Sequence, residues 1–267
     1  MRKDISHKIA VVTSFNNKLF DKYAKRTIAT YSWPFPLYIY SEDFDGGRLL
    51  EMESLGSKTV KVRNIFELDP ECKDFVARNS YRKVPISKSG FEDYLYDGVR
   101  FCYKPFSVAH FILNDCDYDI VIWIDADVVW SRKKMTEEFV FNSLTGDDIM
   151  LSYFGRNFMH SECGFLVFNL KHPRIDDYLV KMRNMYITDE IYKIKEQHDS
   201  YVWDYVRVDF EQEYAVKNKN LSGDYEGDIH PMAYSFMNVY FDHLKGNNKH
   251  RLHHPTWLKN KGVGFLQ

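Results

Sequence analysis

The chain of 267 residues contains 45% hydrophobic and 28% charged residues, which is typical of a folded globular protein and not of a disordered one. Its formal net charge of −2 gives no sign of the basic surface that nucleic-acid-binding proteins use, so we expect no nucleic-acid partner. The four cysteines form no Cys-x-x-Cys pair, which argues against a zinc site of that spacing and favours free thiols in a reducing compartment.

The sequence shows no sign of a membrane-spanning or secreted protein. Its first residues lack the apolar region of a signal peptide, and no apolar run approaches the roughly 18 residues that span a bilayer. We therefore expect a cytoplasmic protein without a transmembrane segment, which could still contact a membrane peripherally.

Apolar runs and helical periodicities alternate along the chain. The pattern predicts strands at 8–15, 35–44, 57–62, 118–125, 147–154 and 163–170. It predicts helices at 18–31, 70–80, 103–114, 173–186 and 189–206, followed by irregular polar chain. The run 118–125 is apolar without alternation, as expected for a strand covered by helices on both faces. The sequence therefore predicts an α/β fold with a largely parallel central sheet flanked by helices.

Two carboxylates, Asp125 and Asp127, directly follow the apolar run 120–124 in the sequence IVIWIDADVVW. Ligands of parallel sheets bind at the carboxyl ends of the strands, where this pair is expected. The two charges would repel each other in apolar surroundings, and a divalent cation would keep both ionised. Residues i and i+2 point to the same side, so both can reach one Mg²⁺ or Mn²⁺ ion. The alternative is a solvated turn, because Asp-x-Asp is short and common.

Three segments resemble one family of enzymes. The run IVIWIDADVV resembles the Asp-x-Asp motif of nucleotide-sugar-dependent glycosyltransferases with the GT-A fold. The segments SECGFLVFNL (161–170) and HLKGNNK (243–249) are similar to motifs of the retaining family that contains glycogenin and bacterial lipopolysaccharide galactosyltransferases. The resemblance implies a single GT-A (Rossmann-like) domain over residues 1–267. Its nucleotide-binding half would be 1–130, and 131–267 would bind the acceptor and complete the metal site.

The resemblance also implies a metal and diphosphate site. Asp125, Asp127 and His243 would bind Mn²⁺ or Mg²⁺, with Asp125 also near the ribose. Gly246 would let the backbone approach the diphosphate, and Lys249 would neutralise its charge. The alternative for the segment around His243 is a solvated basic tail with a turn. His230 is the substitute if His243 is not the third ligand.

The donor nucleotide would contact residues earlier in the chain. By the same resemblance, Thr13, Ser14 and Phe15 would lie near the nucleotide base. Arg100 and Lys104, which precede the strand with the acidic pair, would reach the nucleotide sugar. For these two basic residues, a charge at a helix edge in solvent is an equal alternative.

The sequence departs from the family at EQHDSYVWDY (196–205), where the family usually has Asp-Gln-Asp. Asp199 matches the last member, while Gln197 and His198 replace the first two. Asp199 and His198 would lie near the anomeric carbon or the donor sugar hydroxyls, although Asp199 could instead cap a helix. Glu162 stands where the family often has Asn, and it is either a contact to a sugar or a polar turn residue.

These residues favour a metal-dependent glycosyltransferase that transfers a sugar from a nucleotide donor, expected to be a UDP-sugar, to a hydroxyl of a glycan with retention of configuration. An inverting enzyme, with Asp199 or Glu162 as general base, is the alternative. A sugar-1-phosphate nucleotidyltransferase is less favoured because the first strand is not followed by a Gly-rich loop. A non-catalytic sugar-binding module is less favoured because all three candidate metal ligands are present.

Overall fold

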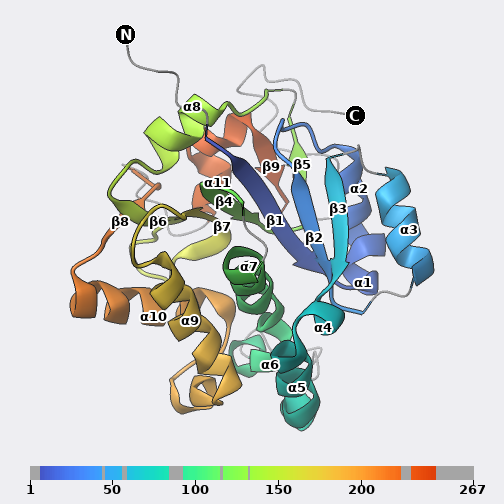
Figure 1. Cartoon of the computed structure of the whole chain (residues 1–267), viewed down its shortest axis with the longest axis vertical. Coiled ribbons are helices and arrows are strands. Elements are labelled where there is room, and N and C mark those ends of the chain that lie inside the picture. The colour runs from blue at the N-terminus through green and yellow to red at the C-terminus, as the bar shows by residue number, and fades with distance from the viewer. Residues whose placement is uncertain are drawn as a thin grey trace.

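The computed structural model describes residues 7–43, 46–55, 59–83, 93–114, 117–131, 133–223 and 230–244. Its centre is a seven-stranded sheet in the order β3-β2-β1-β4-β7-β6-β8 (Figure 1). The strands of this sheet are β1 (Ile9–Phe15), β2 (Leu37–Ser41), β3 (Val60–Asn64), β4 (Ile120–Ile124), β6 (Ile149–Phe154), β7 (Glu162–Asn169) and β8 (Lys217–Asn220). A separate two-stranded sheet pairs β5 (Val128–Trp130) with β9 (Phe241–His243).

Most neighbouring strands of the large sheet run parallel. Pairing is parallel from β3 through β2 and β1 to β4, and again between β6 and β8. Strand β7 is antiparallel to both of its neighbours, β4 and β6. Strands β2, β4 and β7 are buried at every position, and β4 is accordingly apolar without alternation. The mostly parallel α/β sheet expected from the sequence is confirmed.

Helical segments connect the strands. The α-helices are α1 (Asn17–Leu19), α2 (Lys25–Ala29), α3 (Gly46–Leu55), α4 (Ile65–Leu68), α5 (Pro70–Asn79), α6 (Gly98–Phe101), α7 (Tyr103–Asn114), α8 (Glu137–Phe139), α9 (Ile175–Ile187), α10 (Asp199–Tyr214) and α11 (Pro231–Tyr234). Two π-helical turns lie at Phe20–Ala24 and Val140–Leu144, and 3-10 turns lie at Ser80–Arg82, Asp93–Tyr96, Glu190–Lys193 and Phe236–Val239. Within the described ranges, no helix is both long and apolar enough to cross a membrane.

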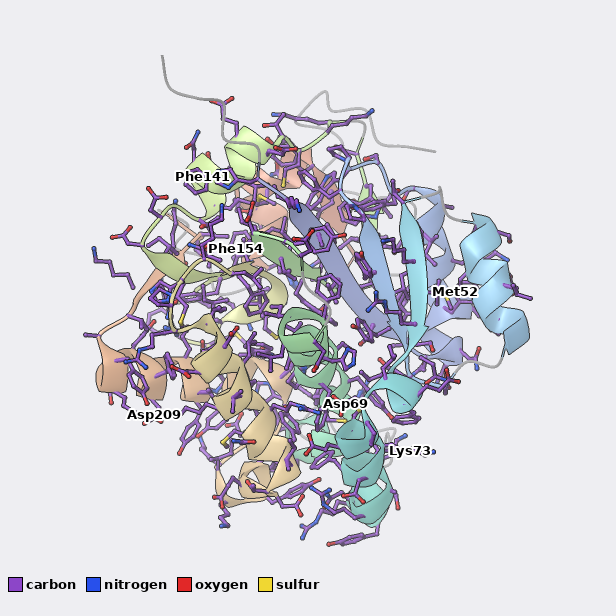
Figure 2. All side chains as sticks on the ribbon, in the orientation of Figure 1. Met52, Asp69, Lys73, Phe141, Phe154 and Asp209 are labelled. Carbon is purple, nitrogen blue, oxygen red and sulfur yellow. The ribbon has the colours of Figure 1, made fainter. Side chains whose placement is uncertain are left out.

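The sheet separates two hydrophobic cores. Alternate residues of β4 point to opposite faces, so Ile122 joins one core and Trp123 joins the other. The first core contains side chains of α2, α3, β5, α11 and β9, and Met52 of α3 faces the sheet within it (Figure 2). The second core contains side chains of α5, α7, α9 and α10. Packing of helices on both faces therefore accounts for the complete burial of β4.

One expected helix has the wrong bounds. The interval predicted as a helix at 189–206 contains a 3-10 turn at Glu190–Lys193, and α10 begins only at Asp199 and continues to Tyr214. The backbone of Asp189 is left-handed, with φ of +59°, which ends the helical path after α9. The side chain of Ile191 in this turn is buried in the second core.

Candidate active site

Asp125 follows the last residue of β4 and is held in line with β7. Its backbone N–H donates to the carbonyl of Gly164 at 2.8 Å. The Trp123 indole Nε1–H donates to Asp125 Oδ1 at 2.9 Å, and Lys104 Nζ lies 3.0 Å from the same oxygen. Because both contacts use Oδ1, they fix the orientation of the carboxylate.

Asp127 is held by elements from both ends of the described chain. The Thr27 hydroxyl of α2 lies 2.6 Å from the carbonyl of Ala126 and 2.8 Å from that of Val128, so it fixes the backbone on either side of Asp127. In the β5–β9 pair, Val128 lies opposite His243. This register places His243 Nε2 3.0 Å from Asp127 Oδ1.

The donor atoms of Asp125, Asp127 and His243 lie within 4.8 Å of one another. Neighbouring ligands of an octahedral ion with bonds of about 2.1 Å are roughly 3.0 Å apart, which matches the distance between His243 Nε2 and Asp127 Oδ1. Two carboxylates and one imidazole suit Mn²⁺ or Mg²⁺. The structure therefore brings together the three residues expected to bind metal, close enough to one another that they could hold an ion. Binding itself stays a prediction.

Lys104 of α7 is buried beside this group. Its ammonium lies 3.0 Å from Asp125 Oδ1 and 2.7 Å from Asp199 Oδ2, and it donates to the carbonyl of Cys163 at 3.0 Å. Burial alone would lower the pKa of Lys104, but the two carboxylates outweigh burial and hold that pKa well above its usual value. Lys104 is thus an internal counter-ion, and the alternative of a solvent-exposed helix-edge charge is wrong for it. Arg100 of α6 is exposed.

Asp199 is both the first residue of α10 and a member of the site. Its Oδ1 accepts a hydrogen bond from the N–H of Ser200 at 2.9 Å, while Oδ2 binds Lys104. Burial alone would raise the pKa of Asp199, but the Lys104 ammonium outweighs burial and holds that pKa well below its usual range. Asp199 is therefore not the cap of α10, because the capping position is His198, and its place near a sugar stays a prediction.

Glu162 is not a turn residue, because it is the first residue of β7 and is buried. Its Oε1 accepts from the N–H of Gly164 at 3.3 Å. A Cβ at Gly164 would lie 3.1 Å from each of Asp125 Oδ2, Glu162 Oε1 and Met232 Sδ. The carboxylates of Glu162 and Asp125 thus both approach Gly164, where a larger residue would make tight contacts with them. The sequence marked the Ser/Gly segment but did not reveal this contact.

The residues expected near the nucleotide base lie at the carboxyl end of β1. Thr13 and Phe15 are buried, and Ser14 is half-buried. The Ser14 hydroxyl donates to Glu42 Oε1 at 3.1 Å, and Asn16 Nδ2 donates to Glu42 Oε2 at 3.2 Å. Burial raises the pKa of Glu42 to about 8. Glu42 could not be recognised from the sequence, because it falls within the strand expected at 35–44, which ends at Ser41.

The remaining candidates do not share a group of possible metal ligands with the acidic pair, or they lie outside the described residues. Gly246 and Lys249 lie outside the described residues. His198 is buried, and its Nε2 lies 3.0 Å from Glu196 Oε2. His230, the substitute third ligand, does not belong to either of the groups of possible metal ligands found within the described ranges.

No protein-family model matches the chain, and no curated protein sequence matches it. Among solved structures, it is similar to the glycosyltransferase GlyE of Streptococcus pneumoniae, at 14% identity and a TM-score of 0.44 over 78% of this chain and 44% of that one. It is also similar to mouse xyloside xylosyltransferase 1, at 11% identity and a TM-score of 0.48 over 80% and 84% of the two chains. A third is the galactosyltransferase LgtC in complex with donor and acceptor sugar analogues, at 11% identity and a TM-score of 0.43 over 73% and 69%.

The chain spans less than half the length of the pneumococcal protein. Function must therefore be argued from the geometry of the site.

Proposed function

We propose that this protein is a metal-dependent glycosyltransferase that transfers a sugar from a nucleotide-sugar donor, most simply a UDP-sugar, to a hydroxyl of a glycan. The main support is the convergence of Asp125, Asp127 and His243 at the carboxyl end of β4. Ligands of parallel α/β sheets bind at this edge. The three donor atoms are held by β4, β5 and β9 before any ligand is present, which reduces the cost of ordering them around an ion.

The reaction would break the bond between the anomeric carbon and a phosphate oxygen and would leave a nucleoside diphosphate with extra negative charge. A divalent ion bound by Asp125, Asp127 and His243 would stabilise that charge. Lys104 and Trp123 hold Asp125 Oδ1 and so fix the orientation of this carboxylate. Within this proposal the nucleotide base would occupy the end of β1 beside Ser14.

The electrostatics of Asp199 favour retention of configuration. An inverting enzyme needs a general base whose pKa is near the working pH. Asp199 is engaged by Lys104 and has a pKa well below its usual range, so it is a poor base. In a retaining reaction the departing phosphate oxygen can accept the proton of the acceptor hydroxyl. Glu162 is then the candidate base for the inverting alternative, and the anomeric configuration of the product, measured by NMR, separates the two.

The first experiment is donor cleavage without an acceptor. The protein is incubated with Mn²⁺ and a panel of nucleotide sugars, and the free nucleoside diphosphate is measured. We expect one donor to be cleaved, and Asp127→Asn or a chelator to lower the rate by about a hundredfold or more, as for loss of a group that stabilises developing charge. Asp147→Asn, which removes the same charge from an exposed turn, is the matched control.

If no donor is cleaved, binding decides the question. Calorimetry with each nucleotide sugar in the presence of Mn²⁺ should give a Kd for at least one donor and none for Asp127→Asn. Absence of binding to every nucleotide sugar would overturn the proposal.

A further inference from the structure

A second group of metal-binding side chains lies outside the acidic pair. His198 Nε2 lies 3.0 Å from Glu196 Oε2, and His160 Nε2 lies 3.7 Å from the same oxygen. The donor atoms of the three residues all lie within 4.8 Å of one another. Glu196 and His198 are two residues apart just before α10, whereas His160 comes from the loop between β6 and β7. The fold therefore brings together ligands from two distant segments.

Both segments are held in place by hydrogen bonds. The N–H groups of Gln197 and His198 donate to the carbonyl of Leu95 at 2.6 and 3.1 Å. On the other segment, the N–H of Ser161 donates to Asp204 Oδ2 at 2.7 Å, directly after His160. The Arg156 guanidinium donates to the carbonyl of Ser161 at 3.2 Å. The three side chains thus converge from a fixed backbone.

We propose that His160, Glu196 and His198 form a second cation site, which binds Zn²⁺. Ligands of a tetrahedral zinc ion with bonds of about 2.0–2.1 Å are separated by about 3.3 Å. The two separations from Glu196 Oε2, 3.0 and 3.7 Å, lie on either side of that value. Two imidazoles and one carboxylate form a donor set found in zinc centres that keep a fourth position open.

The chemistry of this donor set differs from that of the acidic pair. Imidazole nitrogens favour zinc over magnesium, whereas the two carboxylates of Asp125 and Asp127 favour harder ions. Asp204 Oδ2 lies 4.0 Å from His160 Nδ1, where a carboxylate can orient a zinc-bound imidazole after a small movement.

The site is accessible, because the side chain of His160 is 39% exposed. It also adjoins the candidate active site, since His198 precedes Asp199, whose carboxylate binds Lys104. A zinc ion held here would occupy the end of α10 where the donor sugar or the acceptor would approach. Zinc binding does not depend on the proposed transferase activity, however, and can be measured without a nucleotide.

The test is a zinc titration by calorimetry of the Asp127→Asn protein, in which the first metal centre is disabled. We expect Zn²⁺ to bind, and we expect His160→Ala or Glu196→Gln, added to this background, to remove one equivalent or weaken it by more than about tenfold. His172→Ala, at a partly exposed histidine outside both groups, is the matched control. Co²⁺ titrated in place of Zn²⁺ should give visible absorption typical of tetrahedral coordination, lost in the same variants.

Circular dichroism establishes whether each variant is folded. If His160→Ala does not fold, Glu196→Gln tests the site in its place. The proposal is overturned if the Asp127→Asn protein binds no Zn²⁺, or if folded His160→Ala and Glu196→Gln proteins bind it as tightly as the control. Absence of binding to every nucleotide sugar, with intact zinc binding, would overturn only the proposed transferase.

Discussion

Lys104 is the residue on which the electrostatics of the site depend. Its ammonium is the shared partner of Asp125 and Asp199, and its side chain is only 8% exposed. Removing one partner of a buried ionic group leaves uncompensated charge. Lys181 makes a similar three-membered arrangement with Asp209 and Glu213 on the surface. The chain therefore contains a buried and an exposed version of the same interaction.

We predict that Lys104→Met lowers the free energy of unfolding by about 3 kcal/mol, because Asp125 and Asp199 lose their counter-ion. Lys181→Met should lower it by less than about 1 kcal/mol, because water screens the surface charges. Chemical denaturation of both variants measures the difference. Equal losses would show that burial does not strengthen the Lys104 interactions.

The depressed pKa of Asp199 predicts a specific pH dependence. An unfolded Asp has a pKa near about 3.9, so as pH falls below that value the unfolded state takes up a proton before the folded state does. The stabilisation is complete above about pH 4 and is lost as pH falls towards the depressed pKa. We predict that wild-type stability decreases more steeply than that of Asp199→Asn below pH 4 in urea titrations. Parallel curves would contradict the assignment.

Substitution of Gly164 is expected to weaken cation binding while the protein still folds. In Gly164→Ala, the new Cβ would press on Asp125 Oδ2 and Glu162 Oε1, each 3.1 Å away. We expect Mn²⁺ affinity to fall by about tenfold or more, as for disturbed orientation of ligands. Gly98→Ala is the control, because its Cβ would meet no atom closer than 3.4 Å. Calorimetric titration with Mn²⁺ measures the effect, and unchanged affinity in Gly164→Ala would show that the carboxylates move aside freely.

At the scale of elements, α2 supports the loop between β4 and β5. The buried Thr27 hydroxyl contacts the carbonyls of Ala126 and Val128 on both sides of Asp127. We predict that Thr27→Val, which keeps the shape but removes the hydroxyl, costs about 1–2 kcal/mol of stability and weakens Mn²⁺ binding. Thr188→Val, at the exposed end of α9, should do neither. Thermal unfolding and calorimetry on both variants check this prediction. Normal Mn²⁺ binding in Thr27→Val would show that the position of this loop does not affect the metal site.

The sequence predicted the elements whose pattern depends on burial. Strands β4 and β7 were predictable because both faces are covered, so that β4 and residues 165–168 of β7 are continuously apolar. Strand β8, with the sequence KNKN, has no apolar residue and forms only because it pairs with β6 at the edge of the sheet. Helix α3 and the three-residue strands β5 and β9 were missed for a related reason, since short or weakly amphipathic segments depend on tertiary contacts.

Residues of the candidate site could be predicted from the sequence only where they belong to a motif at the end of a strand. Asp125 and Asp127 were identified from their position after an apolar run, and His243 from a family resemblance. Glu42 and the group formed by His160 and Glu196 were not identified, because each depends on contacts between distant segments that no spacing along the chain reveals.

At the scale of the whole molecule, the candidate cation would connect early and late parts of the chain. It would join the end of β4 to β9 and thereby stabilise the folded state by mass action. At an Mn²⁺ concentration about 100 times its Kd, the gain is about 2.7 kcal/mol, which corresponds to a rise of several degrees in Tm for a chain of this size. We predict this shift for the wild type and none for Asp127→Asn by calorimetric scanning. A shift of equal size in both proteins would place the ion elsewhere.

The pairing of β5 with β9 also fixes when the site can form during synthesis. His243 follows Asp127 by 116 residues, so at 5–20 residues per second the ribosome needs roughly 6 to 23 seconds to add the histidine after the acidic pair. Throughout that interval the nascent chain has both carboxylates but neither the third donor nor the strand that positions it. A translation product that stops before Phe241 therefore cannot assemble the cation site, whatever part of the large sheet it has already formed.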